Sequence, residues 1–554
     1  MPSSPNHRPP RPRLAVRVGV TGHRPNKLAQ TDEPLLRTRI REVLEYVRRV
    51  AQDVITRPDS PYAADQPILD VSSSLAEGAD QIAAREAVEL GFELHCPLPF
   101  DRDEYEKDFT TSESRAEYRC LLDKATTVLE LKGSRATPTE AYEAVGREVL
   151  KQSNMLIAIW DGKEAAGQGG TGQIVTEAVD EEIPTVWIRS IFPHRSHLLV
   201  CDENWNRREL ELDALSSHLR QFLAPDDMRD LPRDRACWPT LRDVLLLCRD
   251  KMRKPYRKAD TVALKYQRWH RWIIALAAIF GTFAVLFAIV QLSQFALGSW
   301  PKRSEPLAAA VALGAVILGS LAAFQSAWLL ERHKAERYRL LKFGFLTNPQ
   351  LWKRVALGPT EQRDYLSRET ATIAALTHKA IHEWIETDDT LEMPTGVGQI
   401  PLSMLQPLVS YYLEKRLRVQ KRYFARRAEQ NTRLDRYTRL LPPMLFYLSV
   451  AFALSHFVFD LFESLHVWSL LLITLAAALP VVGAGIRTFR TAYEFARNTI
   501  RFRAKRDALT HLEEKLQKET EPEEIFRDLW RCEQVMKAEH REWLSLMIEA
   551  EWFG

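Results

Sequence analysis

The chain has 554 residues, and its 76 Lys and Arg against 73 Asp and Glu give a formal charge of only +3. This balance excludes the global basic footprint of a nucleic-acid-binding protein, so no nucleic-acid partner is expected. Hydrophobic residues at 45% and charged residues at 27% exclude a disordered chain. The six cysteines form no CxxC pair, so neither a zinc module nor a disulfide framework is indicated, and no metal site is expected.

Residues 1–13 are rich in Pro and Arg and are expected to form a disordered tail. After them, residues 14–190 alternate short apolar runs with helical patterns. We predict strands at 14–20, 68–73, 92–98, 127–131, 155–160 and 184–188, and helices at 34–55, 139–152, 173–180 and in a segment that ends at Leu90. Strands that alternate with helices predict an α/β fold, a Rossmann-like doubly wound parallel sheet.

In such a sheet, ligands bind beyond the carboxyl ends of the strands, at a switch in strand order. Three loops there contain glycines, hydroxyls and a cation, and two of them open helices whose free N–H groups favour an anion. Each signal has a duller interpretation, because a glycine-rich loop is often only a tight turn and a lone histidine often only orders a loop. The residues that we expect to bind ligand are Thr21, Gly22, His23, Arg24, Ser73, Ser74, Glu77, Gly78, Asp80, Asp161, Gly169, Gly170, Thr171, Gly172 and Glu177.

Four uncharged apolar runs follow, each about long enough to cross a bilayer. They lie at 273–292, 307–330, 440–459 and 467–486. Four buried helices of a soluble core are the alternative, which we disfavour because a soluble helix seldom stays apolar on every face. The sequence therefore predicts an all-α membrane region with four transmembrane helices in two tandem pairs.

The distribution of Lys and Arg predicts the orientation of these spans. Basic clusters flank both pairs on their outer sides, whereas the first connecting loop has only Lys302 and Arg303 and the second, 460–466, has none. Both loops should therefore face outward. We expect a multi-pass protein of the inner (cytoplasmic) membrane with cytoplasmic N- and C-termini.

The remaining segments complete a predicted domain plan. It consists of a linker at 191–252, a first two-helix unit at 253–345, a cytoplasmic helical connector at 346–425, a second two-helix unit at 426–515 and a cytoplasmic C-terminal helix at 516–554.

Three runs carry a resemblance to a known family: 17–24 (RVGVTGHR), 73–80 (SSLAEGAD), and Trp160-Asp161-Gly162 with Gly169-Gly170-Thr171. They resemble the SLOG superfamily, a Rossmann-like group that includes the LOG phosphoribohydrolases and DprA. The paired spans with basic and aromatic flanks look like SLATT-type two-helix membrane effector domains. Together they resemble effectors of bacterial anti-phage systems of the CBASS or Thoeris kind.

This resemblance implies a nucleotide or NAD-derived signalling ligand that triggers a pore or membrane disruption, and thereby cell death or growth arrest. No further cofactor is expected. The expected partners are the small-molecule signal, the lipid bilayer, further copies of the chain in a homo-oligomer, and a signal-producing enzyme encoded nearby.

LOG enzymes have a loop of sequence PGGxGT, with a glutamate three residues after the threonine. The chain departs from this motif. Gln168 and Gln173 stand at the proline and threonine positions, Thr176 stands at the glutamate position, and Glu177 comes one residue late. This favours binding over hydrolysis, so no catalytic residue is assigned. A membrane-anchored LOG-like nucleotide N-glycosidase that uses Glu177 and Arg24 is the alternative, and plain membrane recruitment of a scaffold is a third.

Overall fold

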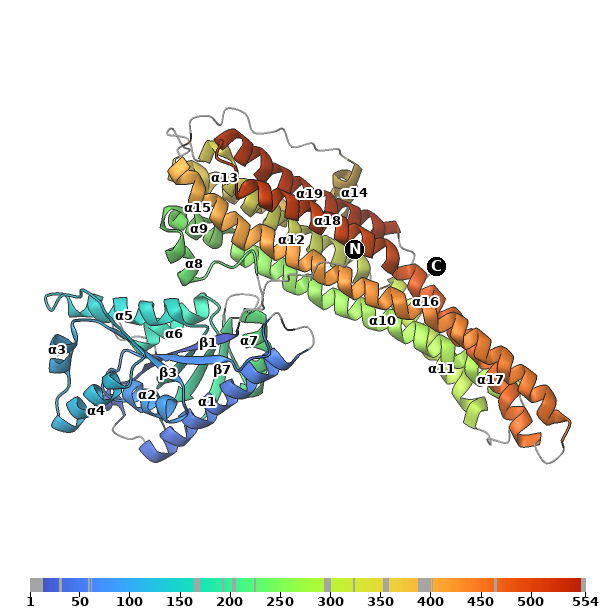
Figure 1. Cartoon of the computed structure of the whole chain (residues 1–554), viewed down its shortest axis with the longest axis horizontal. Coiled ribbons are helices and arrows are strands. Elements are labelled where there is room, and N and C mark those ends of the chain that lie inside the picture. The colour runs from blue at the N-terminus through green and yellow to red at the C-terminus, as the bar shows by residue number, and fades with distance from the viewer. Residues whose placement is uncertain are drawn as a thin grey trace, which may run out of the picture. The chain divides into compact units, whose positions relative to one another are not determined.

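The computed structural model describes residues 13–28, 32–57, 60, 62–163, 170–191, 194–201, 206–223, 226–292, 300–321, 324–351, 358–386, 400, 402–462 and 466–549. The chain divides into two compact units. The first comprises Met1–Pro225 and Asp230–Pro239, and the second comprises Asp226–Arg229 and Thr240–Gly554. Figure 1 shows that the first unit combines strands and helices, whereas the second is built from helices.

One eight-stranded sheet forms the centre of the first unit, in the order β4-β3-β2-β1-β5-β6-β7-β8. The strands are β1 (Ala15–Gly22), β2 (Ile68–Ser72), β3 (Glu93–Leu98), β4 (Thr127–Glu130), β5 (Met155–Trp160), β6 (Thr185–Arg189), β7 (Ser196–Cys201) and β8 (Arg207–Leu210). Strands β1 to β6 are parallel, which confirms the predicted α/β fold. Because β2 and β5 flank β1 on opposite sides, the strand order reverses at the carboxyl ends of β1 and β5.

The sheet continues beyond residue 190, into the region predicted as a linker at 191–252. Strand β7 pairs antiparallel with β6, and β8 pairs antiparallel with β7. Strand β8 reads RREL, and its three charged residues hide it from a search for apolar or alternating runs. The sheet is therefore mixed, with a parallel majority and an antiparallel edge.

The helices of the first unit cover both faces of the sheet. They are η1 (Pro25–Lys27), α1 (Glu33–Thr56), α2 (Ala79–Glu89), α3 (Arg102–Tyr105), η2 (Glu106–Asp108), α4 (Ser112–Asp123), α5 (Pro138–Gln152), α6 (Thr171–Asp180), η3 (Leu212–Ala214), α7 (Leu215–Leu223) and α8 (Pro232–Cys237). Helix α6 buries its apolar face on the side of β5 that carries Leu156 and Trp160.

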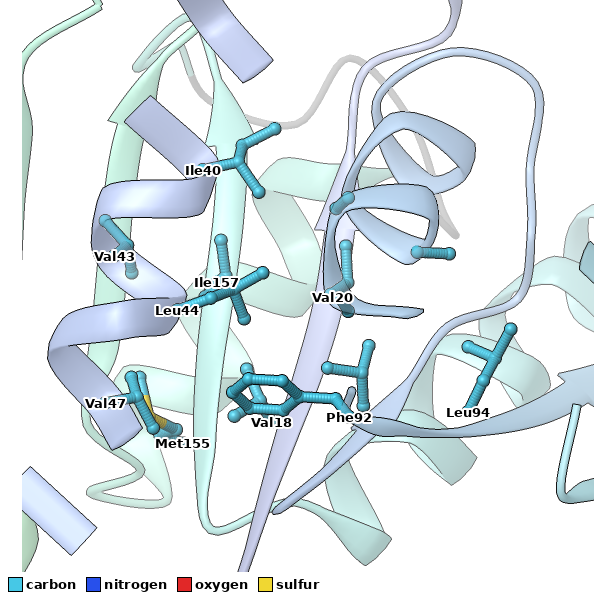
Figure 2. Packing of buried hydrophobic residues seen from close by; sticks show 14 of the residues in the cluster. Val18, Val20, Ile40, Val43, Leu44, Val47, Phe92, Leu94, Met155 and Ile157 are labelled. Atoms are coloured by element: carbon cyan, nitrogen blue, oxygen red, sulfur yellow. The ribbon is translucent and has the colours of Figure 1, made fainter. Parts of the chain in front are cut away.

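Helix α1 begins at a well-formed cap, because the Asp32 carboxylate accepts the Leu35 N–H at 3.1 Å. Its buried residues recur at helical spacing. Figure 2 shows Ile40, Val43, Leu44 and Val47 of α1 pointing toward Val18 and Val20 of β1 and Met155 and Ile157 of β5. Because this cluster is closely packed, truncating Leu44 to alanine would cost about 2–5 kcal/mol.

The helical part of the chain follows. Its helices are η4 (Pro239–Leu241), α9 (Arg242–Cys248), the π-helix η5 (Arg249–Arg253), α10 (Lys254–Leu292), α11 (Trp300–Leu321), α12 (Phe324–Leu346), η6 (Pro349–Leu351), α13 (Pro359–Ala374), α14 (His378–Glu386), α15 (Leu402–Tyr412), the π-helix η7 (Leu413–Leu417), α16 (Arg418–Asp460), α17 (His466–Tyr493), α18 (Phe495–Leu516) and α19 (Pro522–Glu549).

Two similar three-helix arrangements make up most of the second unit. Helix α10 packs against α11 and α12, and α16 packs against α17 and α18, while α10 also contacts α17. Helix α11 and the C-terminal end of α16 lie at the same end of this unit (Figure 1). Each long first helix, α10 or α16, directly follows a π-helix. The two tandem pairs expected from the sequence are therefore packed together.

Three described helices are long and apolar enough to cross a membrane, or four if a bent pair counts as one span. The bent pair is 303–319 with 324–346, inclined by 43°, and it takes up the predicted span 307–330. Residues 322 and 323 of that span lie outside the described residues. Only 6%, 11% and 17% of the most apolar windows of the other three helices are buried. Such exposed apolar surface indicates contact with lipid.

The C-terminal helix predicted at 516–554 overlaps α19, which is a separate helix from α18. Helix α18 ends at Leu516, α19 begins at Pro522, and the two helices pack against each other. Upstream, Glu494 adopts a left-handed backbone with φ of 43°, which separates α17 from α18. The fourth predicted span, 467–486, lies within α17.

Candidate ligand-binding site and membrane segments

Two helix N-termini converge on the carboxyl end of β1. The Thr171 hydroxyl at the start of α6 donates to the Gly22 carbonyl oxygen at 3.0 Å. The N–H of Ala79, the first residue of α2, donates to the His23 carbonyl oxygen at 3.1 Å. A Cβ on Gly22 would lie 2.4 Å from the Ala79 Cβ, so only glycine allows this approach. The positive ends of two helix dipoles therefore meet beside one loop, at the switch in strand order.

The loop before α2 depends on backbone geometry that only glycine adopts easily. Gly78 has φ of +105°, and a Cβ there would lie 2.8 Å from the His23 carbonyl oxygen. The Ser73 hydroxyl accepts the Leu75 N–H at 3.2 Å and so fixes the turn. Glu77 is half-buried in the same loop.

Asp80 lies buried in the first turn of α2, and its surroundings shift its proton equilibrium. The Ser74 hydroxyl donates to its carboxylate at 3.0 Å. Burial raises the pKa of Asp80 to about 7, although Ser74, Arg24 and the Gly22 N–H each act to lower it. This carboxyl group is therefore able to donate or accept a hydrogen bond near neutral pH.

His23 and Asp161 join the ends of β1 and β5. The His23 Nε2 lies 3.0 Å from Asp161 Oδ1 and 3.2 Å from the Asp161 backbone nitrogen, and its N–H is assigned as the donor to the carboxylate. Burial lowers the pKa of His23, and Asp161 only partly opposes this. The pKa of Asp161 is lowered, because its hydrogen bonds with His23 and the Lys163 N–H outweigh its desolvation. A neutral imidazole that donates its Nε2–H to the Asp161 carboxylate orders the loop.

Arg24 supplies the positive charge at this edge. Its guanidinium lies 5.1 Å from the ring centre of Tyr142, and the Tyr142 hydroxyl donates to Asp108 at 2.5 Å. Burial acts to lower the pKa of Arg24, but Tyr105, Tyr142 and Asp108 outweigh it and the pKa is raised. These three partners could not be predicted from the sequence, because they come from α3, η2 and α5 and meet Arg24 only in the folded chain.

The predicted residues divide into those at this edge and those elsewhere. Gly170 caps α6 and Gly172 is buried in its first turn, whereas Gly169 lies outside the described residues. Glu177 sits farther along α6. There its carboxylate binds Arg147 of α5 at 3.0 Å and Gln173 at 3.2 Å. The members that come together near Gly22 are Thr21, His23, Arg24, Ser73, Ser74, Gly78, Asp80, Asp161, Gly170 and Thr171.

The membrane-length helices show the features that lipid demands. Trp269 and Trp272 near the start of the α10 span are 54% and 67% exposed, and Trp468 at the start of α17 is 58% exposed. Such aromatic side chains suit a membrane interface. Polar groups are satisfied between helices: the Ser449 hydroxyl of α16 donates to the Ala476 carbonyl oxygen of α17 at 2.6 Å.

A buried ionic network lies at the base of the long helices. Arg416 in η7 is 2% exposed and contacts Asp227 at 2.7 Å and Glu533 of α19 at 3.0 Å. The Tyr412 hydroxyl donates to the same Glu533 at 2.6 Å. Asp226, which precedes Asp227 in the chain, binds Arg253 of η5 at 3.1 Å. The segment Asp226–Arg229 is thus tied to both π-helices.

These features define a class of protein: an α/β unit with a potential ligand site, joined in one chain to membrane-length helices. Residues 412–543 match the family SLATT_1, described as SMODS and SLOG-associating 2TM effector domain 1. The match runs from the end of α15 to within α19 and contains the predicted second unit, 426–515. It supports the SLATT part of the resemblance for the second pair of spans. No curated protein matches the sequence.

Proposed function

We propose that this protein is a ligand-gated membrane effector of a bacterial anti-phage defence system. In this proposal the N-terminal unit is a SLOG-like domain that binds a nucleotide or NAD-derived signal, and the helices then form a pore or disrupt the bilayer. The observation that carries it is the presence, in one chain, of the matched two-transmembrane effector domain at 412–543 and an α/β unit with convergent helix N-termini.

The chemistry of the edge near Gly22 supports a phosphate-bearing ligand. The positive ends of the α2 and α6 helix dipoles favour an anion, and Arg24 adds a permanent charge. Asp80 offers a carboxyl group that could hydrogen-bond a ribose hydroxyl, the role that acidic residues play in dinucleotide sites. This combination of an anion site and a hydroxyl site suits a nucleotide better than inorganic phosphate.

The segment Asp226–Arg229 supports transmission of the signal. In the chain it lies between two stretches of the first unit, yet it packs with the second. A signal acts only if it binds the active state more tightly, and each 1.4 kcal/mol of preference changes the equilibrium about tenfold. Binding that displaces this segment would act on the bases of α10 and α16 through Asp226 and Asp227.

The membrane output follows from the composition of the spans. The four predicted spans contain no Asp, Glu, Lys or Arg. Selective channels and transporters commonly place such groups in the membrane. We therefore favour a homo-oligomeric pore or a bilayer disruptor in the inner membrane, with both chain termini cytoplasmic. The signal would come from an enzyme encoded nearby.

The alternative, a LOG-like nucleotide N-glycosidase, needs Glu177 and Arg24 to act together. The Glu177 carboxylate binds Arg147, whereas Arg24 lies over Tyr142. These separate partners favour the effector over the enzyme.

Dye release tests the proposal. The full-length protein is reconstituted into liposomes that hold a self-quenching dye, and cyclic oligonucleotides, NAD and ADP-ribose derivatives are added in turn. At least one should release the dye. Loss of a charged hydrogen bond costs about 1.5–3 kcal/mol, so Arg24→Ala should raise the half-maximal concentration at least about tenfold.

Arg39→Ala is the matched control, because Arg39 on α1 pairs only with Glu42, at 2.7 Å, among the described residues. It should respond like the wild type. No release with any of these compounds, or equal responses of the two arginine variants, would contradict the proposal.

A further inference from the structure

A row of polar side chains lies on one face of the sheet, over β2 and β3. Asp70 pairs in register with Glu93, and Ser72 pairs with His95. Alternate residues of a strand point to the same face, so these four side chains share one face. Leu94 points to the other face, into the buried hydrophobic cluster that Figure 2 shows. Four polar side chains side by side on an otherwise apolar sheet call for a structural or functional explanation.

Three atoms in this row are buried without a hydrogen-bond partner among the described residues. They are Asp70 Oδ1, Ser72 Oγ and His95 Nε2. The side chain of Asp70 is only 6% exposed, and its other oxygen, Oδ2, lies 3.2 Å from Arg17 Nε. Buried polar atoms are nearly always satisfied, so a cluster of unpaired ones indicates a partner such as an ion.

The orientation of His95 points the same way. Its Nδ1 lies 2.5 Å from the Thr127 hydroxyl oxygen. If Nδ1 donates its proton there, the lone pair of Nε2 faces Asp70 Oδ2 at 3.8 Å. Two electron-rich atoms then face each other across a gap that a cation would fill. Histidine ligands of metals are commonly held in this way through their second nitrogen.

We propose that Asp70, Glu93 and His95 bind a divalent transition-metal ion, with zinc as the best-matched probe. One potential ligand atom from each residue lies within 4.8 Å of the others. Two carboxylate oxygens and one imidazole nitrogen form a donor set that zinc accepts, and three protein ligands leave a coordination position open. No motif in the sequence indicated this site, because Asp70 lies on β2 whereas Glu93 and His95 lie on β3.

The open position borders a cavity of about 520 Å³ lined by Asp70, Ser72 and His95 together with Arg17 and Lys151. A water molecule or an oxygen donor of a small anion fits such a position. The site lies on the sheet face and is separate from the ligand edge near Gly22. It therefore stands whether or not the signalling proposal is correct.

Zinc binding by the full-length, tag-free protein in detergent tests the site. The protein is stripped with a chelator, dialysed against zinc and analysed for bound metal. We expect one equivalent to depend on the three ligands. His95→Gln and the exposed, structurally benign Glu93→Gln should each weaken zinc binding at least about tenfold.

His197→Gln is the control, because His197 lies on β7 of the same sheet and makes a ring contact with Trp187 instead. It should bind zinc like the wild type. Cobalt should give the visible absorption of a coordinated ion in the wild type and in this control, and not in His95→Gln.

The absence of zinc binding at up to about 100 µM free zinc would overturn the site. Equal zinc affinity of the wild type and both ligand variants would also overturn it.

Discussion

The ion pair between Arg416 and Asp227 provides the sharpest test of the second unit. Arg416 is 2% exposed and touches two carboxylates, those of Asp227 and Glu533. The substitution Arg416→Met keeps the volume of the side chain and removes its charge. Two buried carboxylates then lose their main counter-ion, although Asp227 keeps Arg339 at 3.2 Å.

Removing one partner of a buried ion pair costs about 3–5 kcal/mol. The second unit unfolds with an entropy of about 2.1 cal/mol/K per residue, and it contains about 300 residues. The melting temperature of this unit should therefore fall by about 5–8 °C. Tryptophan fluorescence of the detergent-solubilised protein during heating would measure the change.

Arg433→Met is the matched control on α16, because Arg433 is 67% exposed and its Glu429 partner is 3.8 Å away. An exposed pair of this kind is worth about 0–1 kcal/mol, so its melting temperature should change little. Asp227→Asn should lie between the two variants, because Arg416 then keeps Glu533. The reasoning fails if Arg416→Met and Arg433→Met melt at the same temperature.

Three further outcomes are expected. Gly22→Ala should abolish ligand binding and destabilise the first unit by about 1–3 kcal/mol, because the new Cβ would meet α2 at 2.4 Å; calorimetry would show both. Asp80→Asn should gain stability over the wild type as pH rises from about 4 to 7, by about 1.4 kcal/mol per pH unit. The reason is that the raised pKa makes the folded wild type hold a proton that the unfolded chain releases. Thermal melts of both proteins across this range would measure the difference, and a difference that stays constant with pH would contradict the prediction. In intact cells, an impermeant maleimide should label the variant Leu461→Cys, because Leu461 is 69% exposed at the end of α16. It should not label the native Cys120 and Cys237. Labelling of these two cysteines before permeabilisation would contradict the predicted topology.

The parallel core and the long apolar helices could be predicted from the sequence because they depend on local periodicity. Apolar runs such as 155–160 have few alternatives to a buried strand, and runs of about 20 uncharged residues have few alternatives to a membrane helix. Strand β8 escaped because its charged residues lie on an exposed edge. The break between α11 and α12 escaped because hydropathy reports composition and carries no information on direction.

The candidate site could be predicted only in part, for a related reason. Glycines and hydroxyls next to strand ends identify themselves, as Gly22 and Thr171 do. Long-range partners such as Tyr142 do not, since α5 comes beside Arg24 only after folding. Glu177 shows the opposite case, because a side chain one helical turn beyond a loop turns toward the neighbouring helix.

Two adjacent aspartates anchor the two helical hairpins, α10 with α11 and α16 with α17, at one point of the chain. Asp226 holds the base of α10 through Arg253, and Asp227 holds the base of α16 through Arg416. Because these aspartates are consecutive, a displacement of one is transmitted to the other through a single peptide unit. The two hairpins should then tilt together, and one extra residue inserted between the aspartates would let each hairpin tilt independently.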